Sequence, residues 1–177
     1  GSMSTPGGQI VCHVLLCETA DSLVLVDTGF GLHDVRDPKR RLGLSATLLG
    51  AKLDESETAI RQVEALGFTA DDVRDIVVTH FDLDHVGGLS DFPHARVHVS
   101  KTEWDAVQKP TRRERLRYRR SQFSHHPTVL TYSADGEPWR GLPAARPLDG
   151  LGTEFALVPV VGHSRGHSAI AVDAGEN

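Results

Sequence analysis

The chain has 177 residues, of which 39% are hydrophobic and 24% charged, and its 19 Lys and Arg face 24 Asp and Glu, giving a formal charge of −5 with neutral histidines. These values are typical of a globular domain, and a chain of this length can bury one sizeable core. The acidic balance argues against a dedicated nucleic-acid binder, which normally has a basic excess. No run approaches the ~20 apolar residues of a membrane helix.

We expect one domain over residues 4–177, with Gly1-Ser2 read as an expression scar. No signal-peptide pattern opens the chain. Cys12 and Cys17 lie too close together, in one expected strand, to indicate a disulfide framework. The sequence therefore predicts a cytoplasmic protein without a membrane partner.

The N-terminal third begins with two β-rich runs, 10–18 and 22–27, whose short polar connection predicts a hairpin. Residues 31–53 have no clear period, so we expect a loop with at most a short helix. Apolar residues at helical spacing predict a helix over 55–66, and Gly67 supplies its stop.

Further along, the buried strand 76–79 runs directly into His80. A capping box, Ser100 to Glu103, predicts a helix through Val107. The other expected strands are short apolar runs at 95–99, 128–132, 154–160 and 169–173. Strands with interspersed helices indicate a layered α/β or α+β domain.

Four possible metal ligands follow the strand that ends at Thr79, namely His80, Asp82, Asp84 and His85. The first three alternate, so extended backbone would project them to one side. Imidazole and carboxylate suit zinc and similar cations, and the glycine pair that follows lets backbone approach closely.

A second histidine loop, with Gly162-His163, follows the apolar run 157–161. The alternative interpretation is a solvated acidic turn with incidental histidines. Two histidine loops, each at the end of a strand in one small domain, favour a metal site.

At these residues the sequence resembles the metallo-β-lactamase-fold hydrolases over nearly its whole length. The family pattern is an Asp-Thr-Gly loop, then His-x-His-x-Asp-His, then Gly-His-[Ser/Thr]-x-Gly-His. This chain has Asp27-Thr28-Gly29, then His80 to His85, then Gly162 to His167, in that order. The resemblance implies a four-layer αββα sandwich with the site at one edge, between two sheets.

Carried over residue by residue, the resemblance implies that His80 and His163 hold a first metal and that Asp84 and His85 contribute to a second. His167 matches a position that supports the loop without binding metal. The resemblance implies one or two zinc ions in all. Asp27 would support the loops, although a turn-forming Asp before glycine is an equally good interpretation.

Asp82 departs from the family pattern, because it stands where a histidine is usual. We expect it to remain a ligand of the first metal. Its charge should lower the Lewis acidity of that metal and could admit Mn²⁺ or Fe²⁺. On this basis Asp82→His should retain or tighten metal binding.

The resemblance implies a metal-dependent hydrolase of a small ester, lactone or thioester that uses metal-activated water, with Asp84 as the catalytic residue that orients the water or takes its proton. One rival hypothesis is a non-catalytic metal-binding fragment. Another is a nuclease of the same superfamily, although a nucleic-acid partner is not expected.

An arginine-rich segment, 112–120, carries six arginines in nine residues. It could be a solvated helix face, a substrate-capping or carboxylate-binding element, or a nucleic-acid-binding arm. Five residues in or just after it could line a cap over the site: Tyr118, Gln122, Phe123, His125 and His126.

We expect the C-terminal part of the fold to be missing or supplied elsewhere, because the family's later ligand motifs do not follow His167. We expect Asp173, at the far end of its strand, not to be a ligand. The last strand should lack a partner and expose an edge. A homodimer or a second polypeptide segment could then complete the fold.

Overall fold

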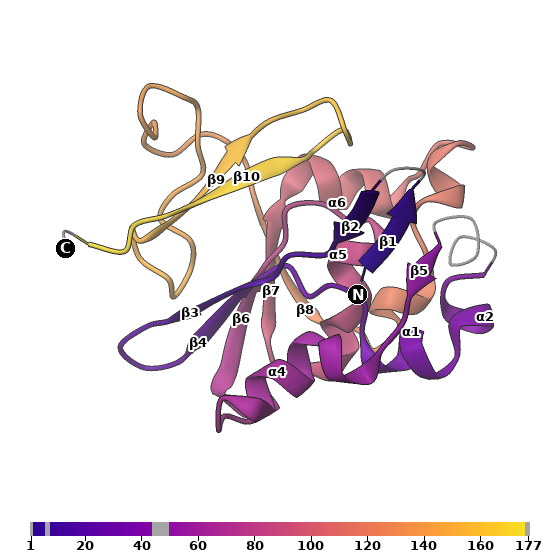
Figure 1. Cartoon of the computed structure of the whole chain (residues 1–177). Helices are drawn as coiled ribbons and strands as arrows, with labels where there is room; N and C mark the ends of the chain where they lie inside the picture. The colour runs from indigo at the N-terminus through magenta and orange to yellow at the C-terminus, as the bar shows by residue number, and fades with distance from the viewer. Residues whose placement is uncertain (1, 6–7, 44–49, 176–177) are drawn as a thin grey trace.

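The computed structural model describes residues 2–5, 8–43 and 50–175 (Figure 1). Its centre is a five-stranded sheet in the order β3-β4-β6-β7-β8. Strand β3 pairs antiparallel with β4, and all the other neighbours are parallel. The strands are Leu15–Glu18 (β3), Leu23–Val26 (β4), Val73–Val77 (β6), Arg96–Ser100 (β7) and Thr128–Tyr132 (β8).

The apolar run of β4 is continuous, and β6 ends in the buried Ile76 and Val77, because both faces of the sheet are covered. Leu23, Leu25 and Ile76 join one hydrophobic cluster, whereas their neighbours Val24 and Val77 join another. Successive side chains of a strand point to opposite faces, so each strand contributes to two cores.

Helices cover the first face. Ile60 and Val63 of α4 and Ala106 and Val107 of α6 pack in the cluster on that side. The helices are Leu32–Arg36 (α1), Pro38–Arg41 (α2), Ala59–Ala65 (α4), Leu83–Val86 (α5) and Lys101–Gln108 (α6). Short 3-10 turns lie at Glu55–Glu57, Ala70–Asp72, Gly87–Asp91, Glu114–Leu116 and Arg120–Phe123.

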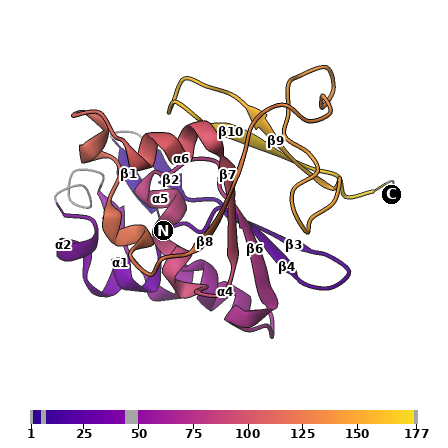
Figure 2. The ribbon, with the colours of Figure 1, turned by 180° about the vertical axis from the view of Figure 1, so that it is seen from behind.

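A hairpin covers the second face. Strand β9 (Phe155–Pro159) pairs antiparallel with β10 (Ser168–Val172). Phe155 and Leu157 pack with Val24 and Val77 of the main sheet. In both views the hairpin and α4 lie on opposite sides of this sheet (Figure 1, Figure 2).

Two expectations about strands are wrong. The run 10–18 is not one strand: β2 (Gly8–Val11) pairs with β1 (Ser2–Thr5), which also pairs with β5 (Ala51–Lys52), and the chain then crosses to the main sheet at β3. The final strand does have a partner, because β10 forms a complete ladder with β9.

The expected layered α/β class is confirmed by the mixed sheet and its helical cover. The hairpin supplies the start of the second sheet expected for an αββα sandwich. The helix expected over 55–66 is present but shorter: a 3-10 turn occupies Glu55–Glu57, α4 begins at Ala59, and Gly67, whose φ is +91°, follows its end. Within the described ranges, no helix is long and apolar enough to cross a membrane.

The start of α1 packs closely against the 3-10 turn over Gly87–Asp91. A Cβ on Gly31 would lie 2.4 Å from the carbonyl oxygen of Gly87, so only glycine fits there. The backbone N–H of Leu32 donates to Asp91 Oδ2 at 2.9 Å. Burial, with a further contribution from the charge of Asp34, raises the pKa of the Asp91 carboxyl to about 6.

Replacing Asp91 with Asn should remove a pH-dependent loss of stability. Between pH 4 and 6 the folded protein keeps a proton on Asp91 that the unfolded chain releases, so the stability of the wild type falls as pH rises through this range. The free energy of unfolding of Asp91→Asn should gain about 2 kcal/mol on the wild type between pH 4 and 7.

Urea unfolding at four pH values measures this difference, with the exposed Asp71→Asn as the matched control. A difference between Asp91→Asn and the wild type that stays constant with pH would contradict the assignment.

Candidate metal centre

The candidate site lies where parallel strands end at one edge of the main sheet. Asp27 follows β4, and Thr79-His80 follow β6 after a short extension. The loop 160–167 between β9 and β10 is fastened to the same edge. Ser168 N–H donates to the carbonyl oxygen of Thr79 at 3.1 Å, and the Ser100 hydroxyl donates to that of Gly166 at 2.7 Å.

Three of the predicted ligands converge at this edge. His163 Nε2 lies 3.1 Å from His80 Nε2 and 2.9 Å from Asp82 Oδ2, and the last two atoms are 3.3 Å apart. His80 is buried, Asp82 is partly exposed, and His163 is exposed. The fold thus brings together residues 83 positions apart in the chain, with their ligand atoms facing one common point.

Thr79 and Asp27 orient the rings of His80 and His85. The backbone N–H and hydroxyl of Thr79 donate to the two carboxylate oxygens of Asp27, at 2.8 and 2.7 Å. Because that hydroxyl donates its only hydrogen to Asp27, it can only accept a hydrogen bond from His80 Nδ1, 2.9 Å away. Asp27 Oδ2 also lies 2.7 Å from His85 Nδ1. Both histidines therefore keep Nε2 available as a lone-pair donor to a metal.

Asp84 and His85 form a separate pair. Asp84 lies in α5, so the alternation that starts at His80 ends at Asp82, and Asp84 does not join the group of three. Its Oδ2 is 3.6 Å from His85 Nε2. Although burial opposes protonation, the hydrogen bond and charge of Asp27 raise the pKa of His85.

Asp82 occupies the N-cap position of α5 but its side chain makes no capping hydrogen bond. Its carboxylate instead pairs with Arg117, whose Nη2 is 2.6 Å from Oδ2 and whose Nε contacts Oδ1. Burial opposes ionisation, yet the hydrogen bonds from Arg117 hold the pKa of Asp82 well below its ordinary value. These contacts keep the Asp82 side chain ionised and oriented toward the two histidines, as an anionic metal ligand requires.

Glu103 joins three segments of the site, although its side chain is fully buried. Its Oε1 accepts from the N–H of Phe81 at 3.1 Å and from the Tyr118 hydroxyl at 3.2 Å. Its Oε2 accepts from the Ser164 hydroxyl at 2.7 Å and from the N–H of Gly166 at 3.0 Å. One carboxylate thus fastens the His80–Asp82 loop to the His163 loop.

Sequence reasoning missed Glu103 and Arg117 as parts of the site. The Ser100-x-x-Glu103 pattern was interpreted as a helix cap, and Ser100 does accept from the N–H of Glu103, but the glutamate side chain turns to the loops. The segment 112–120 is not one helix face, because it forms a short 3-10 turn that directs Arg117 at Asp82. Four of its arginines are exposed to solvent: Arg112, Arg113, Arg115 and Arg120.

Gln122 and Phe123, two of the residues expected to line a cap over the site, do not do so. Gln122 is buried and bonds to Asp34 and Arg41, away from the ligands. Phe123 packs against Phe81 and Trp104 in the helical layer.

The two remaining predicted positions, His167 and Asp173, do not belong to the group of three ligand residues. The ring of His167 packs edge-on to His80, with centroids 4.8 Å apart. Asp173 lies beyond β10, at the end opposite the 160–167 loop, where its N–H donates to Glu154.

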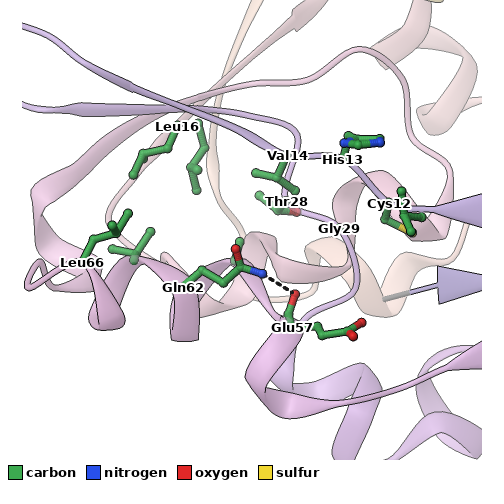
Figure 3. A pocket seen from close by; sticks show the side chains of 13 residues that line it. Cys12, His13, Val14, Leu16, Thr28, Gly29, Glu57, Gln62 and Leu66 are labelled. Atoms are coloured by element: carbon green, nitrogen blue, oxygen red, sulfur yellow. Dashed lines mark hydrogen bonds between the residues drawn. The ribbon is translucent and has the colours of Figure 1, made fainter.

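A cavity of about 440 Å³ lies between the Asp27-Thr28-Gly29 loop, β3 and α4 (Figure 3). Leu16 and Leu66 line one end, and Glu57 and Gln62 lie along its lower side. Burial, followed by the charge of Asp84, raises the pKa of the Cys12 thiol on its wall to about 11. Because Thr28 and Gly29 line this cavity and directly follow Asp27, the cavity adjoins the site on the side of Asp27.

Comparison with known proteins identifies the family of this chain. The family model of the metallo-beta-lactamase superfamily matches residues 6–174. A probable metallo-hydrolase of Mycobacterium tuberculosis is 54% identical over 176 residues, which is 99% of this chain and 56% of that protein. The chain thus spans little more than half the length of this relative.

More distant relatives include an N-acyl homoserine lactonase of Bacillus thuringiensis, 25% identical over 97% of this chain and 63% of that protein. Among solved structures, an N-acyl homoserine lactone hydrolase with N-hexanoyl-L-homoserine at its catalytic metal centre has a TM-score of 0.68 and 22% identity. The match covers 96% of this chain and 62% of that one. This likeness shows a shared fold.

Replacing Glu103 with Gln should destabilise the protein by about 2–4 kcal/mol, because an amide N–H₂ would face two of the four donors and leave buried groups unpaired. Chemical denaturation measures the change. Asp105→Asn is the control, since Asp105 lies on the same helix in an exposed pair with Lys101 and should cost at most ~0.5 kcal/mol. Equal effects of the two substitutions would show that Glu103 does not fasten the loops.

Proposed function

Because the chain belongs to the metallo-beta-lactamase superfamily, we propose that it is a metal-dependent hydrolase of a small ester, lactone or thioester. The observation that carries the proposal is the convergence of His80 Nε2, Asp82 Oδ2 and His163 Nε2 at one edge of the sheet.

The donor set suits a divalent cation. Ligand atoms that surround zinc tetrahedrally at ~2.1 Å lie about 3.4 Å from one another, and the three distances here are 2.9, 3.1 and 3.3 Å. Two imidazoles and one carboxylate make a typical set for a catalytic zinc with an open position, and Mn²⁺ or Fe²⁺ also accept these ligands.

Asp84 and His85 are the proposed ligands of a second ion. His85 is supported in this role by its bond to Asp27, since a carboxylate on the far nitrogen fixes the tautomer and orientation of a metal-binding histidine. A divalent ion bound in this centre supplies Lewis acidity and a water that ionises near neutral pH.

Asp84 is the proposed proton acceptor for that water. Its carboxylate does not belong to the group of three ligand atoms, and its Oδ2 lies 3.6 Å from His85 Nε2. Thr79 and Asp27 would hold the rings of His80 and His85 in place during the reaction.

A lactone is the substrate class that the relatives favour, because distant sequence matches and structural neighbours are named as lactonases. The contacts of Arg117 do not favour the rival nuclease hypothesis. Its donors are engaged by Asp82 and His163 rather than presented to a polyanion.

Loading the protein with Zn²⁺ should raise its melting temperature at pH 7, because the metal ties together two loops that are far apart in sequence. His80→Ala and His163→Ala should abolish the rise, whereas His94→Ala, at an exposed position outside the site, should not. Metal content and melting curves with and without a chelator provide the measurement. Protein that melts at one temperature in zinc and in chelator would contradict the metal site.

The zinc-loaded protein should open N-hexanoyl homoserine lactone or a simpler γ-lactone, and Asp84→Asn should lower kcat by ~10²-fold or more. A panel of lactone, thioester, aryl ester and phosphodiester substrates gives the comparison. Turnover of the phosphodiester alone would favour the nuclease. Bound metal without any turnover would favour a non-catalytic metal-binding protein.

A further inference from the structure

Arg117 contacts two ligands of the proposed first metal site, Asp82 and His163. Its Nε and Nη2 both bond to the carboxylate of Asp82, one to each oxygen. Its Nη1 donates to the carbonyl oxygen of His163 at 2.5 Å, and its Nη2 is 2.6 Å from His163 Nε2. The guanidinium therefore bridges the two loops that carry the ligands.

The pair is partly shielded from water. The side chain of Arg117 is 27% exposed and that of Asp82 is 18% exposed. A paired guanidinium and carboxylate in this setting cancel one another's charge at short range more effectively than two solvated ions would.

We propose that Arg117 is the counter-charge of Asp82. Asp82 stands at the position where the family pattern has a neutral histidine. Together the carboxylate and the guanidinium carry no net charge, so the pair presents a metal with the charge of a histidine ligand. This inference rests on the proposed metal site and adds a positioning residue to it.

The geometry leaves room for both roles of Asp82. The oxygen that faces His80 and His163 is Oδ2, whereas Oδ1 faces Arg117 Nε. A metal on Oδ2 leaves the Oδ1 bond and the bond to the His163 carbonyl in place. Only the contact between Nη2 and the two ligand atoms would be exchanged for the metal.

Two other roles for Arg117 fit less well. A substrate-binding arginine needs free donors, but Nε and Nη1 have partners within the protein that a metal on Oδ2 would leave in place. A purely structural brace would need no cation, and a neutral donor could replace it.

The counter-charge changes what is expected of Asp82→His. An added histidine would leave the guanidinium beside the metal without its carboxylate, so Asp82→His should weaken zinc binding rather than tighten it. Arg117→Gln should have the opposite effect, since it removes a positive charge next to a cation site but keeps hydrogen-bond donors.

The test measures Zn²⁺ affinity by competition with a chelating indicator for the wild type, Asp82→His, Arg117→Gln and the double variant. Arg117→Gln should bind Zn²⁺ roughly tenfold more tightly and Asp82→His roughly tenfold more weakly. The double variant should recover the wild-type affinity or exceed it. Arg117→Lys should stay near the wild type, as should Arg113→Gln, which removes an exposed arginine nearby.

Melting in chelator supplies a second readout, in which the two single variants should together lose more stability than the double variant does. If Asp82→His does not fold, the Zn²⁺ affinities of Arg117→Gln, Arg117→Lys and Arg113→Gln still test whether the charge of Arg117 matters. Weaker zinc binding by Arg117→Gln, or no difference from Arg113→Gln, would overturn the counter-charge. A wild type that binds no zinc would overturn the proposed metal site as well.

Discussion

The buried carboxylate of Glu103 is the constraint on which the site depends. A fully buried anion is expensive unless several donors solvate it, and here four donors from three separate segments do so. The segments cannot satisfy Glu103 unless the His80–Asp82 loop, the His163 loop and the turn that carries Tyr118 all meet at the start of α6. The same requirement that stabilises the fold therefore sets the distance between the ligand loops.

Charge balance around Asp82 follows from that placement. Tyr118 is held by Glu103, so the preceding Arg117 is delivered next to Asp82 and His163. On the other side Asp27 collects bonds from Thr79 and His85, in a backbone conformation with φ of +57° that non-glycine residues seldom adopt. Each half of the site is thus positioned by its own carboxylate, Glu103 on one side and Asp27 on the other. Neither residue belongs to the group of three ligand residues.

Local patterns predicted the elements and the order of the motifs well. Apolar runs predicted β4 and the end of β6, and helical spacing with the stop at Gly67 predicted α4, because these signals lie within a few residues. The partners of Glu103 and Arg117 could not be predicted, since they lie up to 63 residues away and leave no local period. The break between β2 and β3 was missed for the same reason: Cys12 to Val14 look like strand, and only the crossing between two sheets interrupts them.

Anomalous diffraction at the zinc edge, from crystals of the protein grown with Zn²⁺, tests the central claim most directly. The account predicts a strong anomalous peak bonded to His80 Nε2, Asp82 Oδ2 and His163 Nε2, with Arg117 still on the outer oxygen of Asp82. Zinc bound elsewhere, with the His80 and His163 loops apart, would contradict it.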